Sequence, residues 1–152
     1  MTKSQKVSYS AVFTALAMIF SYVEAILPIN FGVPGMKLGL ANLVIVTGLY
    51  YMSEKDVFLI SLTRILLMGL LFGNGMSLLY SLTGGILSYI IMITLKKKTS
   101  LSVLAVSVSG GVSHNIGQLA AAAFAVNNIH IFYYLPALLI AGVVTGLLIG
   151  IV

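Results

Sequence analysis

The chain contains no cysteine and few charged residues. Of its 152 residues, 7% are charged and 60% are hydrophobic, whereas an ordinary soluble domain has about 25% charged and about 45–50% apolar residues. The missing cysteine excludes disulfides, thiol nucleophiles and cysteine metal sites. A surface with so little charge does not face water, so the composition predicts an all-α integral membrane protein.

Catalytic and nucleotide-binding motifs are also missing. There is no G-x-x-x-x-G-K-[ST] motif, so ATP hydrolysis by this chain is not expected. Asp56 is the only aspartate, and Glu24 and Glu54 are expected at opposite ends of the membrane, which leaves no carboxylate pair for magnesium. No Ser-His-acid set, H-E-x-x-H motif or nucleic-acid-binding pattern can be recognised in the sequence. We therefore expect no catalytic residues, no metal or cofactor and no nucleic-acid partner, and we predict that the chain is not an enzyme.

Apolar runs, separated by polar residues or by Gly and Pro, fill the whole chain. A membrane crossing takes about 20 apolar residues, so the length predicts a single transmembrane domain over residues 1–152 with no room for a soluble domain. The six candidate helices are approximately 7–27, 38–52, 57–72, 76–95, 101–126 and 131–152. The second and third runs are short, which favours helices that are shielded by neighbours or that face a water-filled cavity.

The lysines divide unevenly between the connections. In a six-helix arrangement, six of the seven lysines fall on one side, and only Lys37 falls on the other. The six are Lys3, Lys6, Lys55, Lys96, Lys97 and Lys98. Since cytoplasmic loops carry an excess of cations, the sequence predicts a multi-pass protein of the cell membrane with both termini in the cytoplasm.

Polar side chains at membrane depth are the candidates for substrate binding. A charged side chain there costs about 2.5–3.5 kcal/mol on insertion scales and is a functional hypothesis by default. The candidates are Glu24, Lys37, Asn42, Arg64, His114, Asn115 and Gln118. All are expected at mid-depth or nearer the outside, which predicts an outward-opening polar cavity. The alternatives are a structural ion pair for Arg64 and Glu24, and a hydrogen-bonded buried imidazole for His114.

Two further features concern the first helix and the connection that follows it. Ala11 and Ala15 form a patch of small residues at the cytoplasmic end of the helix, which could pack within the chain or receive a helix of another protein. The outer connection, residues 28–37, is apolar and contains two prolines and two glycines. We expect it to fold over the cavity as a lid or wall.

Three stretches of the sequence carry a resemblance to a known family. They span residues 33–42, 73–82 and 110–118, and they include the letters P-G-M-K-L-G-L-A-N and H-N-I-G-Q. The chain resembles the Gx transporter family, also labelled heptaprenyl diphosphate synthase component I, over nearly its whole length. That family is similar to the substrate-binding S components of energy-coupling factor transporters. The resemblance implies an S-component-like bundle of six helices, a substrate near the outer face, and a transmembrane coupling protein that packs on Ala11 and Ala15.

The residues and the resemblance together lead to one expected function. We expect a bacterial membrane subunit that captures a small anionic molecule from outside, such as an isoprenoid diphosphate, a flavin or a quinone precursor. Transport would depend on a coupling protein and ATPase subunits, with membrane lipid around the helices. Arg64 and Lys37 would hold the anionic group. The side chains expected to orient it are His114, Asn115, Gln118 and Asn42.

Two alternative functions remain open at this point. One is a non-catalytic membrane subunit that accompanies a soluble prenyl diphosphate synthase, and the other is a proton-coupled carrier that uses Glu24 or His114. The enzymatic label of the family has no catalytic residues to support it in this sequence. The lack of a polar tail after Val152 is compatible with a missing C-terminal segment.

Overall fold

The computed structural model describes residues 2–27, 37 and 39–151, and every regular element within these ranges is a helix. The elements are α1 (Lys3–Ile26), α2 (Asn42–Tyr51), α3 (Glu54–Phe72), α4 (Gly75–Lys98), α5 (Val103–Val126), the 3-10 helix η1 (Ile129–Tyr134) and α6 (Leu135–Ile151). No strand occurs among the described residues. The predicted all-helical fold is confirmed.

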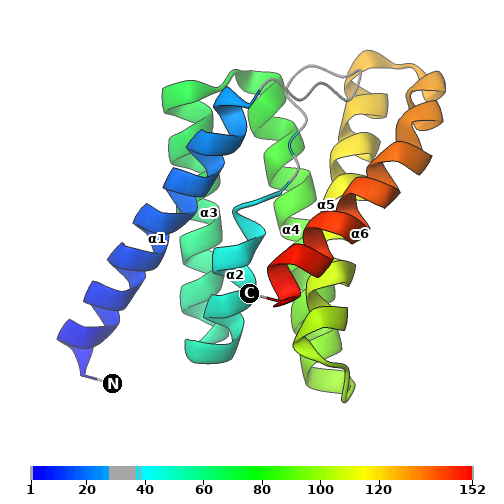
Figure 1. Ribbon diagram of the computed structural model, residues 1–152. Coiled ribbons are helices and arrows are strands. Elements are labelled where there is room, and N and C mark those ends of the chain that lie inside the picture. Colours follow the sequence, from blue (N-terminus) through cyan, green and yellow to red (C-terminus); the bar gives the residue numbers. More distant parts are fainter. Residues whose placement is uncertain (1, 28–36, 38, 152) are drawn as a thin grey trace.

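Successive helices run in opposite directions (Figure 1). The N-terminus of α1, the α2–α3 turn and the α4–α5 turn therefore lie at one end of the bundle. We refer to this end as the lysine end, because it carries Lys3, Lys6, Lys55, Lys96, Lys97 and Lys98. The predicted grouping of these six lysines is thus present in the structure.

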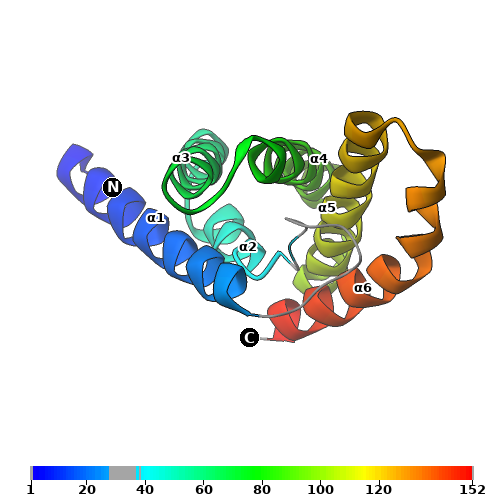
Figure 2. The same ribbon diagram turned by 90° about the horizontal axis from the view of Figure 1, so that it is seen from above.

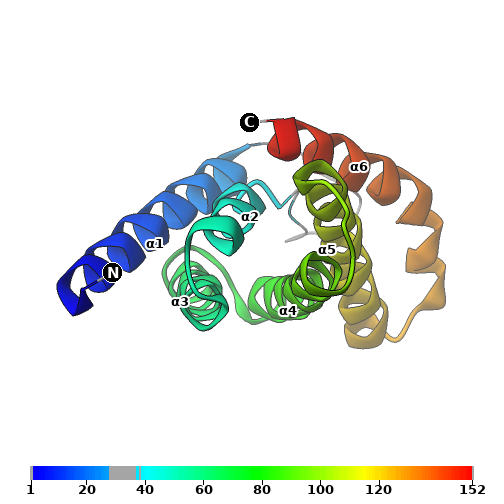
Figure 3. The same ribbon diagram turned by 90° about the horizontal axis from the view of Figure 1, so that it is seen from below.

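The shortest α-helix, α2, occupies the middle of the bundle. It contacts each of the other five α-helices, and views along the bundle from both ends show them arranged around it (Figures 2 and 3). Most of its side chains are buried, including Val44, Ile45 and Leu49. A ten-residue helix is too short to face lipid along a full crossing, and here the neighbouring helices shield it, as the short apolar run predicts.

Three helical stretches are long and apolar enough to cross a membrane: Lys3–Ile26, Gly75–Lys98 and Ile129–Ile151. The helices α3 and α5 are also long, at 19 and 24 residues, but they carry the polar groups predicted at membrane depth. The chain is therefore a membrane protein with several apolar helices. Six crossings and two cytoplasmic termini stay predictions.

Some predicted helix boundaries were wrong, for identifiable reasons. The helix α2 begins at Asn42 and not at residue 38, because Gly39 has a φ of +89°, which a right-handed helix does not contain. The helix α4 continues to Lys98, through a lysine run that the sequence assigned to a loop. Cations in the last turn of a helix interact favourably with its dipole, so this run closes the helix. The last apolar run is divided between η1 and α6, with Pro136 in the first turn of α6, where its missing N–H is tolerated.

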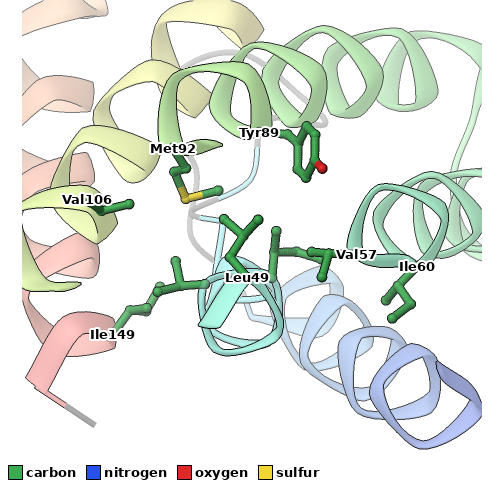
Figure 4. Close-up of a cluster of buried hydrophobic side chains, with 9 residues drawn as sticks. Leu49, Val57, Ile60, Tyr89, Met92, Val106 and Ile149 are labelled. Atoms are coloured by element: carbon green, nitrogen blue, oxygen red, sulfur yellow. The ribbon is translucent and has the colours of Figure 1, made fainter. Parts of the chain in front are cut away.

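Below the middle of the bundle, toward the lysine end, a hydrophobic core fills the space around α2 (Figure 4). It draws buried side chains from α2 to α6, including Leu49, Val57, Met92, Val106 and Ile149. Along α2, α3 and α5 these residues lie closer to the lysine end than the polar candidates do. The core therefore lies between the polar candidates and the lysine end, and its apolar side chains fill that space.

Glycines bring α5 close to both of its neighbours. A Cβ atom at Gly117 would lie 2.8 Å from the Cα atom of Gly84 on α4, and one at Gly111 would lie 2.5 Å from the carbonyl oxygen of Gly142 on α6. Small residues at helix contacts allow this close approach in membranes. The position of α5 between α4 and α6 fixes where its polar side chains point.

Candidate functional site

The polar side chains predicted at membrane depth gather around the segment that leads into α2. Glu24 lies near the end of α1, Arg64 lies in the middle of α3, and His114 and Gln118 lie one turn apart on α5. All four are at most 8% exposed. Their interactions with the described part of this segment, Lys37 and residues 39–41, define the candidate site.

Gln118 holds the backbone of Lys37 with both atoms of its side-chain amide. Its Oε1 atom accepts a hydrogen bond from the Lys37 N–H at 2.8 Å, and its Nε2 atom donates one to the Lys37 carbonyl at 2.9 Å. This pair of hydrogen bonds to one residue resembles a step of a β-ladder. It fixes both the position and the orientation of the Lys37 backbone. Gln118 therefore anchors the connection, and its amide is already satisfied without a ligand.

Glu24 also binds the backbone of this segment. Its Oε1 atom accepts a hydrogen bond from the Gly39 N–H at 2.5 Å. A charged acceptor makes a hydrogen bond about twice as strong as a neutral one, and Gly39 has the positive φ that turns the chain toward α2. Glu24 on α1 and Gln118 on α5 thus hold the segment between their two helices by hydrogen bonds to its backbone.

His114 lies between two glycines from different parts of the chain. A Cβ atom at Gly39 would lie 3.2 Å from the His114 Cδ2 atom, and one at Gly84 would lie 3.1 Å from its Nδ1 atom. The buried Nδ1 atom has no hydrogen-bond partner among the described residues. The imidazole is therefore held in place by packing, with its Nδ1 atom against Gly84 of α4.

Arg64 is buried, and no carboxylate pairs with it among the described residues. One of its terminal guanidinium nitrogens donates to the Ser21 hydroxyl at 3.0 Å, and its Nε atom has no partner among the described residues. Glu24 and Arg64 attract each other through space, but no ion pair joins them in the part of the chain that the structure describes. The guanidinium thus keeps one donor, the Nε atom, that the described residues do not satisfy.

Lys37 adds a second cation to this region. Burial lowers the pKa of the Lys37 ammonium, which lies in the connection outside the helices, and the nearby Glu24 carboxylate offsets part of this effect. The charges of Glu24 and Arg64 both act on Lys37. With one carboxylate against two cations, the site as a whole carries an excess of positive charge.

The two asparagines among the candidates connect helices. The Asn42 amide donates to the Ser88 hydroxyl at 3.3 Å, and Ser88 in turn donates to the carbonyl of Gly110 at 2.9 Å, which links α2, α4 and α5. The Asn115 amide donates to the carbonyl of Leu138 on α6 at 2.7 Å. Asn115 therefore faces α6, although its Oδ1 atom is buried without a partner among the described residues.

Sequence reasoning missed several residues that complete this arrangement. Ser21 binds Arg64, Ser88 bridges Asn42 to α5, and Gly39 and Gly84 enclose His114. Ser21 precedes Glu24 by three residues and so shares its helix face, a signal that could have indicated it. Of the predicted lid, residues 28–36 fall outside the described part of the chain, and only Lys37 is described.

The described residues contain no group of three His, Cys, Asp or Glu side chains that could hold a metal ion. The site instead holds the buried Arg64 guanidinium, whose Nε donor has no partner among the described residues, with the Lys37 ammonium nearby. Such a guanidinium can bind an anion, because arginine presents its donors in a planar fork that matches carboxylate and phosphate groups.

The sequence matches the family described as heptaprenyl diphosphate synthase component I over residues 13–152. The chain belongs to this family. The resemblance stated from the sequence motifs is thereby confirmed, and the match includes the residues of the candidate site. Searches among curated proteins and among solved structures found no match.

Ala11 and Ala15 lie away from this site, in the half of α1 nearer the lysine end. Both are exposed and line an open groove of about 600 Å³. The groove is lined by Lys6, Val7, Ser10, Ala11, Thr14, Ala15, Met18 and Asp56. Within the described part of this family member the two alanines are therefore not covered by another helix.

Proposed function

We propose that this protein is a membrane-embedded substrate-capture subunit, similar to the S components of energy-coupling factor transporters, that binds a small anionic molecule. The observation that carries the proposal is Arg64, which is buried in the middle of α3 with Ser21 as its hydrogen-bond partner and with an unpartnered Nε atom among the described residues. A buried cation without a counter-ion is costly. An anionic ligand would supply the missing partner.

The remaining side chains have distinct roles in this proposal. Lys37 adds positive charge, and the His114 ring packs between Gly39 and Gly84 and so helps to position the segment at Gly39. Glu24 and Gln118 act by holding the segment at Lys37 and Gly39 in place. The hydrophobic core fills the lysine side of the site, so in this proposal the ligand enters from the opposite end.

Arg64→Gln tests the binding role. The variant is expected to lose about 2–5 kcal/mol of binding free energy, because a charge-assisted hydrogen bond in a buried site is lost. Calorimetric titration with an isoprenoid diphosphate, a flavin and a quinone precursor measures this loss, and Lys97→Gln at the lysine end is the matched control. If Arg64→Gln misfolds and Glu24→Gln rescues it, the arginine is half of a structural pair and the proposal is wrong.

Transport against a gradient requires a partner, because the chain has no nucleotide-binding motif. The exposed groove at Ala11 and Ala15 is where a helix of a coupling protein could approach closely. Replacing both alanines with Leu is expected to abolish complex formation and uptake while ligand binding to the isolated chain persists. Uptake by the purified chain alone, driven by a proton gradient and indifferent to ATP, would instead establish a carrier.

The proposed topology has six crossings with both termini in the cytoplasm. Because the chain lacks cysteine, single cysteines at Lys97 and Asn128 can be labelled specifically with a membrane-impermeant reagent. The proposal expects labelling from opposite faces of the membrane. Labelling of both positions from the same face would exclude this topology.

The family description favours a second candidate function, a membrane subunit that accompanies a soluble prenyl diphosphate synthase. Co-purification from the native membrane separates the two functions. The capture subunit is expected to retain ATPase subunits, whereas the second candidate retains a soluble synthase and shows no ATP-dependent uptake.

A further inference from the structure

The charged side chains that can act on a ligand at the candidate site can be counted completely, because the chain has so few. It contains eight Lys and Arg residues and three Asp and Glu residues. Six lysines lie at the lysine end, together with Glu54 and Asp56. The other three charged residues are Glu24, Lys37 and Arg64. Residues 28–36 and 38, which adjoin the site in the sequence, add no ionisable side chain.

Contacts with α1 and with the segment before α2 bring these three charges into one group. Arg64 donates to the Ser21 hydroxyl at 3.0 Å, and Ser21 lies three residues before Glu24 on the same face of α1. Glu24 accepts from the Gly39 N–H, two residues after Lys37 in the chain. The Glu24 carboxylate attracts both cations through space. A ligand beside Arg64 therefore meets all three charges together.

Neither His114 nor the lysine end changes the net charge of this group. We count the His114 imidazole as neutral, because Arg64 and Lys37 both act on it and would repel a third cation. At the lysine end, Glu54 and Asp56 are paired with lysines, and the hydrophobic core lies between that end and the site (Figure 4). The site without a ligand therefore carries two positive charges and one negative charge.

This net charge sets the charge of the ligand that fits best. Glu24 and Arg64 are at most 8% exposed, and an uncompensated charge in such surroundings is costly. An anion with one negative charge brings the total at the site to zero. An anion with two negative charges replaces the excess positive charge by an excess negative charge of the same size, so the site gains nothing from the second charge.

We infer that the site selects a ligand with a single negative charge, such as a monocarboxylate or a phosphate diester, over ligands with two or more. The inference rests on the proposed function and narrows the class of anion that the site captures. Among the ligands named for the titration above, it disfavours the isoprenoid diphosphate.

Methyl phosphate and dimethyl phosphate are probes that differ by one methyl group and one charge. At about pH 8 the monoester carries two negative charges, because its second pKa is about 6, whereas the diester carries one. A ligand that binds the folded state raises the melting temperature, and general salt effects are removed by subtracting the shift seen with Arg64→Gln. The wild type is expected to bind dimethyl phosphate about tenfold more tightly. Equal or tighter binding of methyl phosphate overturns the inference.

Two conservative substitutions change the charge of the site by one unit in opposite directions. Glu24→Gln keeps an oxygen acceptor for Gly39, and in Lys37→Gln the backbone that Gln118 holds is unchanged. Glu24→Gln is expected to shift the preference by at least about tenfold toward methyl phosphate, the effect of one buried unit charge. Lys37→Gln is expected to shift it as far toward dimethyl phosphate.

Lys97→Gln, at the lysine end, is the matched control and is expected to leave the preference unchanged. Because each preference is compared with that of the wild type, the different hydration of the two probes cancels. The same preference in the wild type, Glu24→Gln and Lys37→Gln overturns the inference. If neither probe stabilises the wild type more than Arg64→Gln, the proposed function itself is contradicted.

A second measurement needs no variant. The molecule that the gently extracted wild-type protein retains can be identified by fragmentation in a mass spectrometer, and it is expected to carry one acidic group. A retained diphosphate or dicarboxylate overturns the inference while substrate capture stands, whereas a retained neutral molecule contradicts the proposed capture of an anion.

Discussion

Opposite charges pair with one another at the lysine end of the bundle but not in its interior. At the lysine end, Lys97 and Glu54 approach to 2.6 Å, and Lys6 and Asp56 to 2.9 Å. These pairs tie α3 to α4 and α1 to α3. Each acidic side chain at this end has a cation as its partner.

In the interior, the charged residues Arg64 and Glu24 both form hydrogen bonds with neutral partners. Arg64 donates to the Ser21 hydroxyl, and Glu24 accepts from the Gly39 N–H. Exposed pairs contribute little to stability, about 0–1 kcal/mol, whereas an uncompensated buried charge is expensive. Among the described residues, the charges at the lysine end are paired, whereas the buried Arg64 guanidinium keeps an Nε atom without a partner. This contrast is the basis of the proposal that Arg64 binds a ligand.

The substitution that separates the two interpretations of Arg64 most widely, by the sign of its effect on stability, is Arg64→Met. Arg64→Met removes the unpaired charge, so in the absence of ligand the free energy of unfolding is expected to be unchanged or to rise by about 1–4 kcal/mol. Equilibrium unfolding in mixed micelles measures it. A structural ion pair predicts the opposite sign, a loss of about 3–5 kcal/mol when one partner is removed.

The next test concerns the close packing of α4 against α5 beside His114. Gly84→Leu would place a Cβ atom 2.7 Å from the backbone oxygen of His114, so overpacking between α4 and α5 is expected to cost about 3 kcal/mol or more. Gly75→Leu is the control, because a Cβ atom there meets nothing within 4 Å. Thermal unfolding in detergent compares them, and equal melting temperatures would show that the close approach is unimportant.

The anchor of the connection is expected to have a smaller effect. Gln118→Leu removes two hydrogen bonds to Lys37, which are worth about 1 kcal/mol each. Hydrogen exchange at the Lys37 amide is expected to accelerate, whereas Glu24→Gln, which keeps an oxygen acceptor for Gly39, changes it little. Unchanged exchange in Gln118→Leu would contradict the role of Gln118 as an anchor.

The smallest effect is expected at the lysine end. Lys97→Gln breaks the exposed pair with Glu54, so unfolding is expected to change by less than about 1 kcal/mol and the difference from wild type to shrink further in high salt. If Lys97→Gln changed the free energy of unfolding as much as Gly84→Leu does, the exposed pair would matter as much to stability as the interior packing, which would contradict the contrast drawn here. The same unfolding series, repeated at two salt concentrations, provides the measurement.

Much of the helical arrangement could be predicted from the sequence, because apolar runs and polar breaks are local properties. The side chains of Ser53, Asn74 and Ser102 cap their helices in the structure, as such residues do at helix starts. The end of α4 was missed because a run of lysines reads as a loop when apolar length alone is considered. The start of α2 was missed because the positive φ of Gly39 is not visible in a hydrophobic pattern.

The membership of the candidate site was predictable, but the partners of its side chains were not. The pattern placed Glu24, Arg64, His114 and Gln118 at similar depth, and the structure brings them around one segment. Whether Glu24 binds Arg64 or a backbone N–H depends on distances of a few ångströms between elements far apart in the chain. Periodicity does not encode such distances, so Asn115 was also grouped with residues from which it turns away.

The most direct test of the central claim is native mass spectrometry of gently extracted protein from its own membrane. Wild type and Lys97→Gln are expected to carry one small anionic molecule, and Arg64→Gln is expected to be folded and empty. Retention of the same molecule by Arg64→Gln would contradict the claim that the unpaired guanidinium is the ligand-binding group.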